Sequence, residues 1–172
     1  RQMCIRDSLK DLGNINGYVK RQVEGWIKRY NHSKTDNISN MNFISSWLYE
    51  NQPSEVGSSI VHNDFKYDNL VLDKDDFSKI SAVLDWEMAT IGDPFMDLGT
   101  TLGYWVDKND LPELKLFQLS ATTLDGNPSR EGILELYEKE SGKSISNPVF
   151  YYVFGLFKIC LLYTSPSPRD GL

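Results

Sequence analysis

Two segments near the start of the chain place apolar residues at three- and four-residue steps. In the first, basic residues (Lys20, Arg21, Lys28 and Arg29) separate the apolar positions Tyr18, Val19, Val23, Trp26, Ile27 and Tyr30. This spacing predicts an amphipathic helix with one face toward a core and its basic residues toward water. After a polar loop at 31–40, a second helix that ends near Pro53 is predicted by Met41, Phe43, Ile44, Trp47 and Leu48.

Short apolar segments after Pro53 predict strands. They cover residues 59–62, 70–72 and 80–86, and the turn-forming residues at 73–79 separate the second from the third. We therefore expect a small hairpin in the middle of the chain.

Helical patterns return after the strands. Following a loop at 92–94, Asp97 is expected to cap a helix through Leu98, Leu102 and Trp105, because an Asp side chain can accept hydrogen bonds from unpaired helix N–H groups. Residues 107–127 are typical of loops, and 133–137 predict another helix. A last helix opens at 147–148, and residues 149–159 are apolar almost all round, which predicts a buried core helix. The whole order predicts an α+β fold in which helices dominate.

Composition narrows the class of protein. With 40% hydrophobic and 24% charged residues, the chain can form one globular domain with a core. A net charge of −6 argues against a nucleic-acid partner, since such binding needs clustered Lys and Arg. No apolar run reaches the length of a membrane span and no signal-peptide pattern is present, so we expect a cytoplasmic protein without a membrane partner.

The two ends differ from the rest of the chain. Residues 1–8 and 160–170 match translations of a transposon-library sequencing adapter and its reverse complement, codon by codon. We therefore expect a natural fragment at 9–159 between adapter-derived tails at 1–8 and 160–172, taken from a longer reading frame. Cys4 and Cys160 both fall in the tails, which removes support for a disulfide or a thiolate metal site.

Candidate chemistry is concentrated between the first and second predicted strands and at the end of the third. His62, Asp64, Lys66 and Asn69 share one short loop, and Asp85 follows Asn69 by sixteen residues. Phosphoryl transfer needs a carboxylate to orient the attacking hydroxyl and oxygen ligands to hold magnesium against nucleotide phosphates. Asp64 suits the first task, and Asn69 with Asp85 suits the second. Lys66 could neutralise the transferring phosphoryl group.

Three motifs in order, HNDFKYDN at 62–69, LDWE at 84–87 and GDPFMDLG at 92–99, carry a family resemblance. They resemble the protein-kinase-like aminoglycoside phosphotransferase family. The resemblance implies the C-terminal lobe of a kinase-like fold, ATP and Mg²⁺ as cofactors, and a small-molecule hydroxyl as acceptor. It also implies residue roles: Asp64 as catalytic base, aided by Lys66; Asn69 and Asp85 as magnesium ligands; and His62, Asp93 and Asp97 as supports for the loops.

The sequence around these motifs is similar to the branch of the family that includes the kinase portion of acyl-CoA dehydrogenase family members ten and eleven. That branch implies a hydroxyacyl-CoA acceptor. The resemblance also places the Gly-rich loop and the nucleotide-gripping lysine in a lobe before Leu9. We therefore expect the isolated chain to bind nucleotide weakly and to lack turnover.

Several alternatives remain open at this level. A pseudokinase-like binding module would keep the fold without turnover, although Asp64, Asn69 and Asp85 are all present. A metal-dependent phosphohydrolase would need more histidines than the chain's two. Glu87 is expected on the same side of an extended strand as Asp85, facing either metal or solvent. Asn63, where the family more often has Gly, is expected to tolerate a left-handed backbone.

Overall fold

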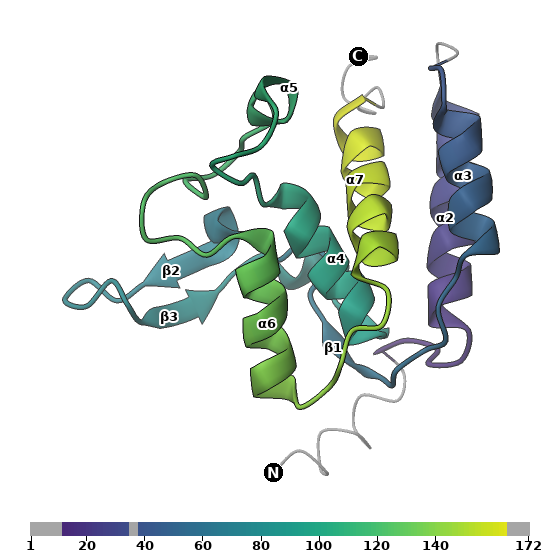
Figure 1. Ribbon diagram of the computed structural model, residues 1–172. Coiled ribbons are helices and arrows are strands. Elements are labelled where there is room, and N and C mark those ends of the chain that lie inside the picture. The colour runs from purple at the N-terminus through teal and green to yellow at the C-terminus, as the bar shows by residue number, and fades with distance from the viewer. Residues whose placement is uncertain (1–11, 35–37, 165–172) are drawn as a thin grey trace, which may run out of the picture.

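The computed structural model describes residues 12–34 and 38–164. In it, helices pack together beside two small antiparallel sheets, one of which projects as a hairpin, in the α+β arrangement expected from the sequence (Figure 1). The tails at 1–8 and 165–172 lie outside the described residues, and residues 160–164 continue the last helix. None of the helices described is long and apolar enough to cross a bilayer.

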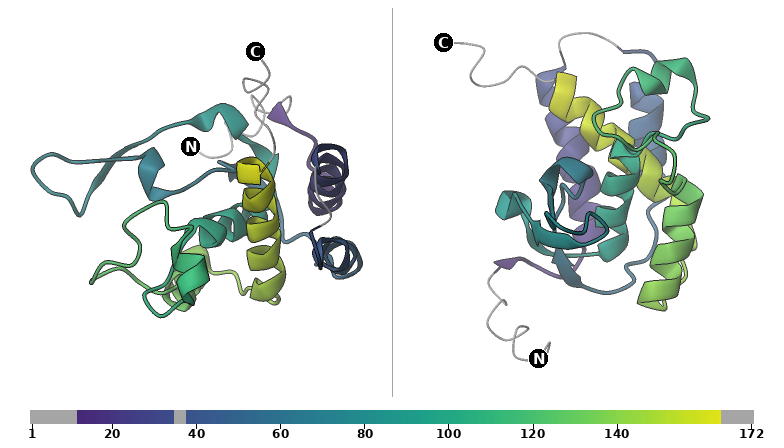
Figure 2. Two further views of the ribbon diagram at one scale, coloured as in Figure 1. Left: turned by 90° about the horizontal axis from the view of Figure 1, so that it is seen from above. Right: turned by 90° about the vertical axis from the view of Figure 1, so that its left-hand side faces the viewer.

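The first two helices form where the apolar spacing predicted them. Helix α2 spans Tyr18–Ser33 and buries Val23 and Trp26 on one face, while its four basic residues are exposed. Helix α3 spans Met41–Glu50 and buries Leu48. The two helices lie side by side and both contact the last helix (Figure 2).

The sheets are only partly as expected. β2 (Leu70–Leu72) and β3 (Ile80–Val83) form the predicted hairpin, but β3 ends three residues before the expected Trp86. β1 (Ser59–Val61) pairs with a strand that the sequence did not indicate, β4 (Thr90–Gly92). The Ile60↔Ile91 register of this pair fixes the chain immediately before the candidate catalytic loop beside the start of α4.

Helix α4 spans Pro94–Tyr104 and begins differently from the prediction. Asp93, not Asp97, is its N-cap, and the Asp93 carboxylate accepts a hydrogen bond of 2.8 Å from the Phe95 N–H. Pro94 at the first helical position explains why the helix starts earlier, because its fixed φ suits a first turn and it has no N–H to satisfy. Asp97 therefore lies inside the first turn, with its side chain available for other contacts.

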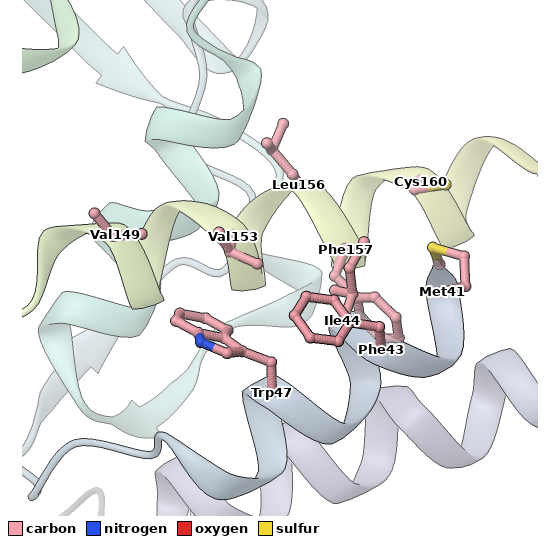
Figure 3. Close-up of a pocket in the computed structure, with 9 residues that line it drawn as sticks. All are labelled: Met41, Phe43, Ile44, Trp47, Val149, Val153, Leu156, Phe157 and Cys160. Carbon is pink, nitrogen blue, oxygen red and sulfur yellow. The ribbon is translucent and has the colours of Figure 1, made fainter. Parts of the chain in front are cut away.

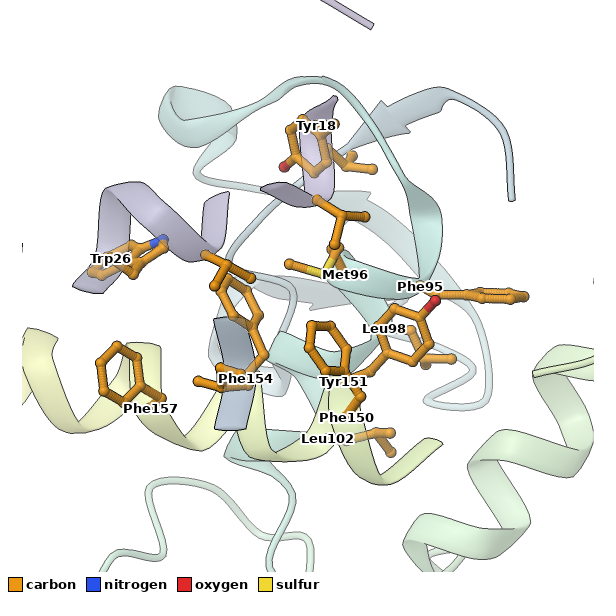
Figure 4. Close-up of a cluster of buried hydrophobic side chains, with 14 of the residues drawn as sticks. Tyr18, Trp26, Phe95, Met96, Leu98, Leu102, Phe150, Tyr151, Phe154 and Phe157 are labelled. Carbon is orange, nitrogen blue, oxygen red and sulfur yellow. The ribbon is translucent and has the colours of Figure 1, made fainter. Parts of the chain in front are cut away.

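Helix α7 (Pro148–Thr164) packs across α4 and forms the centre of the core. Phe95, Phe150, Tyr151 and Phe154 meet there, with the Phe95 and Tyr151 ring centroids 5.6 Å apart (Figure 4). The approach is close enough that a Cβ atom on Gly155 would overlap the backbone of Gly99. α7 is less uniformly buried than expected, since Val149 on it is 60% exposed.

The segment between α4 and α7 is covered by shorter elements. α5 (Pro112–Lys115) lies within the stretch expected to be a loop, and α6 (Arg130–Ser141) includes the predicted helix at 133–137. The Arg130 guanidinium contacts Asp110 and Asp107 and anchors the start of α6 to the loop that follows α4. In Figure 1, α6 lies beside α4 and α5 lies above it.

Candidate active site

The loop from His62 to Asp64 is held by a carboxylate from α4. Asp97 accepts hydrogen bonds of 2.8 Å from the His62 N–H and 2.7 Å from the Asn63 N–H. Burial raises the pKa of the Asp97 carboxyl above its ordinary value, against the opposing effect of these two bonds. Asn63 has a φ of 66°, so the left-handed backbone expected for this Asn is present.

Asp93 fixes the other approach to the loop. Besides capping α4, its carboxylate accepts a hydrogen bond of 2.8 Å from the Val56 N–H. Its side chain is fully buried, and burial raises the pKa of the carboxyl. One carboxylate therefore joins the segment before β1 to the helix that carries Asp97.

His62 uses both ring nitrogens within the protein. Nε2 lies 2.7 Å from the Leu84 carbonyl oxygen, and Nδ1 lies 3.3 Å from the Asp64 N–H. A carbonyl only accepts, so Nε2 carries the proton and Nδ1 is the acceptor. The ring also packs on Trp86 at 4.7 Å between centroids. This arrangement leaves neither nitrogen for a metal and joins the catalytic loop to the end of β3.

Asp64 is the most densely contacted polar group of the site. Tyr104 Oη donates a hydrogen bond of 2.6 Å to its Oδ1, Lys66 Nζ lies 3.0 Å from its Oδ2, and Asn69 Nδ2 lies 3.2 Å from the same oxygen. Burial alone raises the pKa of this carboxyl, but the Tyr104, Lys66 and Asn69 contacts together hold it below its ordinary value. Asp64 is therefore a buried carboxylate that stays ionised at neutral pH and can accept one more hydrogen bond.

The hairpin brings Asn69 beside the residues that precede Asp85. The Leu84 N–H donates to the Asn69 carbonyl oxygen at 2.8 Å, and Leu70 pairs with Val83. The Asn69 side-chain NH₂ faces two acceptors, the carbonyl and the carboxylate of Asp64. The Asn69 Oδ1 must therefore point away from Asp64.

Asp85 follows directly after Leu84, the residue that pairs with the Asn69 backbone. Asp85 is in the left-handed region with φ 63° and is exposed, and no described residue donates to its carboxylate. An amide oxygen and a carboxylate are ligands that Mg²⁺ prefers. No cluster of three or more His, Cys, Asp or Glu occurs in the described part of the chain. Asn69 and Asp85 are thus an amide and a carboxylate of the kinds that can bind a magnesium ion.

Glu87 does not share an extended strand with Asp85. The left-handed turn at Asp85 leads directly into a 3₁₀ turn at Trp86–Met88, so the two-residue alternation expected from a strand is lost. Glu87 is exposed on that turn.

A model of the phosphotransferase enzyme family matches residues 6–131. The chain belongs to this family. Acyl-CoA dehydrogenase family member 10 of Mus musculus is 33% identical over 165 residues, covering 95% of this chain and 15% of that protein. Family member 11 of Homo sapiens is 32% identical over 154 residues, covering 88% of this chain and 19% of that protein.

A solved structure shares the fold. A Ralstonia eutropha JMP134 protein described as an aminoglycoside phosphotransferase superimposes with a TM-score of 0.74 at 31% identity, covering 90% of this chain and 47% of that chain. This match confirms the kinase-like α+β fold inferred from the motifs. The chain spans only 15% to 21% of the length of the curated relatives it matches.

Two residues of this phosphotransferase site were missed from the sequence. Tyr104 lies seven residues, about two helical turns, after Asp97 and so shares its face of α4. Lys158 is the one charged residue in the otherwise apolar α7, and its Nζ donates to the Asn63 carbonyl oxygen. A lone cation within an apolar helix is an available signal, because Lys is almost never fully buried unless paired.

An apolar hollow of about 520 Å³ lies elsewhere, between α3 and α7 (Figure 3). Phe43, Ile44 and Trp47 line it from α3, and Val153 and Phe157 line it from α7. It contains none of the polar groups of the phosphotransferase loop, so it does not extend the candidate active site.

Proposed function

We propose that the chain is the catalytic-loop part of an ATP-dependent kinase that transfers the γ-phosphoryl group to a hydroxyl of a small molecule. The observation that carries this proposal is the environment of Asp64, a buried carboxylate held ionised by Tyr104, Lys66 and Asn69. Membership of the phosphotransferase family supports the reaction class.

Asp64 would orient the acceptor hydroxyl through a hydrogen bond to its carboxylate. The hydroxyl oxygen forms the bond to the γ-phosphorus while the bond from that phosphorus to the β-bridging oxygen breaks, and ADP leaves. The hydroxyl proton passes to Asp64. A carboxylate with a lowered pKa suits this chemistry, because in a loose transition state the proton leaves late and positioning matters more than basicity.

Lys66 and the two proposed metal ligands would act on the phosphates. Lys66 Nζ lies both 3.0 Å from Asp64 and 4.8 Å from the centre of the Tyr104 ring, at the mouth of the loop. From there it can exchange part of its ion pair for the transferring phosphoryl group. Asn69 and Asp85 would hold magnesium, which supplies charge neutralisation on the phosphates when bound.

The acceptor that we propose is a hydroxyacyl-CoA. Two relatives carry the name acyl-CoA dehydrogenase family member, and this chain aligns over most of its length with part of each. A hydroxyl on an acyl chain is a small-molecule alcohol of the class that Asp64 would orient. The enzyme would act in the cytoplasm, without a nucleic-acid or membrane partner.

We also propose that residues 9–159 are a fragment that does not turn over alone. The solved relative is about twice as long as the part that this chain covers. Asp64, Lys66, Asn69 and Asp85 account for the acceptor and metal sides of the reaction, and none of them grips the nucleotide base. The isolated chain should bind ATP and Mg²⁺ weakly and phosphorylate no alcohol.

The test compares the longer reading frame with its Asp64→Asn variant, using radiolabelled γ-phosphate ATP and 3-hydroxyacyl-CoA as probes. Wild type should transfer label to the acyl-CoA, and Asp64→Asn should reduce kcat by roughly a hundredfold or more. Asp68→Asn, an exposed carboxylate on the same loop, is the matched control and should keep full activity. ATP binding without transfer to any alcohol would contradict the proposal and favour a pseudokinase.

A further inference from the structure

Lys158 is a buried cation beside the catalytic loop. It lies in the second half of α7, between Phe157 and Ile159, and is 2% exposed. Its Nζ donates to the carbonyl oxygen of Asn63, a residue 95 positions earlier in the chain. A lysine is almost never buried without a partner, because desolvation of its charge is costly. The carbonyl and the charges around it therefore explain its position.

The charges that act on Lys158 come from two helices, α2 and α4, and from the catalytic loop. Asp64 of the loop and Asp97 of α4 attract the ammonium group, while Arg29 of α2 and Lys66 oppose it. The Trp26 ring of α2 lies 5.7 Å from Nζ and closes the remaining side. Lys158 thus lies within electrostatic reach of both carboxylates that contact the catalytic loop.

The peptide that Lys158 contacts is conformationally unfavourable. Asn63 has a left-handed backbone, which a non-Gly residue keeps only when its surroundings hold it there. Asp97 binds its N–H, Tyr18 donates to its side-chain oxygen at 3.0 Å, and its Nδ2 donates to the Met88 carbonyl oxygen. Lys158 is the donor to its backbone carbonyl oxygen.

We propose that Lys158 is a positioning residue for Asp64. Its ammonium group and the Asp97 carboxylate hold the Asn63 residue from opposite sides, by C=O and by N–H, and so fix the turn that directs Asp64 toward the acceptor. The link to catalysis rests on the function proposed above. The stabilisation of the loop by Lys158 does not rest on that function, and it can be measured without turnover.

Lys158→Met separates positioning from packing. Methionine fills a similar volume but leaves the Asn63 carbonyl oxygen without the Lys158 donor and removes one cation near Asp64 and Asp97, while Lys66 still pairs with Asp64. Removing one partner from a group of buried charges lowers the stability of the whole fold, so exchange at the loop has to be compared with exchange in the core. A positioning role predicts that the loop amides lose more protection than the core amide does.

The experiment is amide hydrogen exchange on this chain, followed by NMR. In Lys158→Met, the His62, Asn63 and Asp64 amides should exchange roughly tenfold faster relative to the Phe154 amide, which reports on the core. Lys158→Arg keeps a cationic donor and should restore most of the protection. Lys28→Met, an exposed lysine on α2, is the control and should leave all four amides unchanged.

Three outcomes would overturn the proposal. Unchanged exchange at the three loop amides in Lys158→Met would show that Lys158 does not hold the turn, and equal acceleration at Phe154 would show a global structural role. In the longer enzyme, Lys158→Met should lower kcat with little change in KM for ATP; an unchanged kcat would also contradict it. A wild-type enzyme that transfers no phosphoryl group would instead contradict the proposed function. The exchange result would still show whether Lys158 holds the loop.

Discussion

The Tyr104 hydroxyl donates a hydrogen bond of 2.6 Å to the Asp64 carboxylate, from the last residue of α4 to a loop forty residues earlier. It is shorter than the contacts of that carboxylate with Lys66 and Asn69, and it lowers the pKa of Asp64 against the effect of burial. The loop after β1 and helix α4 thus meet at one buried carboxylate.

Tyr104→Phe should lower kcat of the longer enzyme by roughly tenfold, because a hydrogen bond to a charged group contributes about 1.5 kcal/mol or more. Loss of this donor also raises the pKa of Asp64, so the acidic limb of the pH–rate profile should move to higher pH. Steady-state kinetics across pH 4 to 8 would measure both. Tyr49→Phe, on an exposed tyrosine of α3, is the control; an unshifted acidic limb in Tyr104→Phe would contradict the assignment.

Asp85→Asn should weaken magnesium binding while keeping the fold. Asn tolerates the left-handed backbone of Asp85 as well as Asp does, so the turn after β3 should persist. The loss of one ligand charge should raise the magnesium concentration for half-maximal activity roughly tenfold. The longer enzyme would be titrated with Mg²⁺ at fixed ATP. Asp75→Asn in the exposed hairpin turn serves as control, and an equal response of the two variants would count against Asp85 as a ligand.

Gly155→Ala should destabilise the chain although Ala is the better helix former. A Cβ on Gly155 would overlap the Gly99 backbone where α7 crosses α4, so the helices must separate. We expect a loss of roughly 1–3 kcal/mol in the free energy of unfolding, measured by urea denaturation. Gly25→Ala on α2 meets only Arg29 Nη1 at 3.7 Å and should instead stabilise by up to about 1 kcal/mol. A neutral Gly155→Ala would show that this crossing can relax.

Stability should rise with pH above neutrality because of Lys158. Burial lowers its pKa to about 8, opposed by Asp64 and Asp97 and assisted by Arg29 and Lys66. Below pH 8, Lys158 is protonated in both the folded and the unfolded chain. Between pH 8 and the pKa of a lysine in the unfolded chain, only the unfolded chain keeps this proton, so unfolding becomes less favourable as the pH rises. From pH 8 to 9.5 the gain is about 2 kcal/mol.

Urea denaturation at each pH would measure this gain, and Lys158→Met should remove it. The window ends before pH 10 because burial raises the pKa of Tyr18 to about 12, and such tyrosines reverse the slope once the unfolded chain ionises. A flat profile in wild type would contradict an elevated cost of the Lys158 charge in the folded state.

The sequence indicated the helices best where one face alone is buried. The apolar stripe from Tyr18 to Tyr30 predicts α2 because its spacing matches the helical repeat, whatever packs against it. β4 and the early end of β3 were not predicted. Three-residue strands carry almost no periodicity, and the left-handed turn at Asp85 depends on the hairpin and on His62 rather than on local preference.

The local sequence also identified the residues that could take part in the reaction. The spacing of Asp64, Asn69 and Asp85 and the Gly-Asp-Pro motif were enough to infer the family and the class of reaction, because these residues lie within short, ordered motifs. Only the tertiary structure decided how Asp64 is held. Tyr104, Asp97 and Lys158 reach the loop from helices 34 to 95 residues away in the chain, counted between the bonded residues. Their pairing follows from the crossing of α4 and α7, and such long-range packing has no local pattern that a sequence can display.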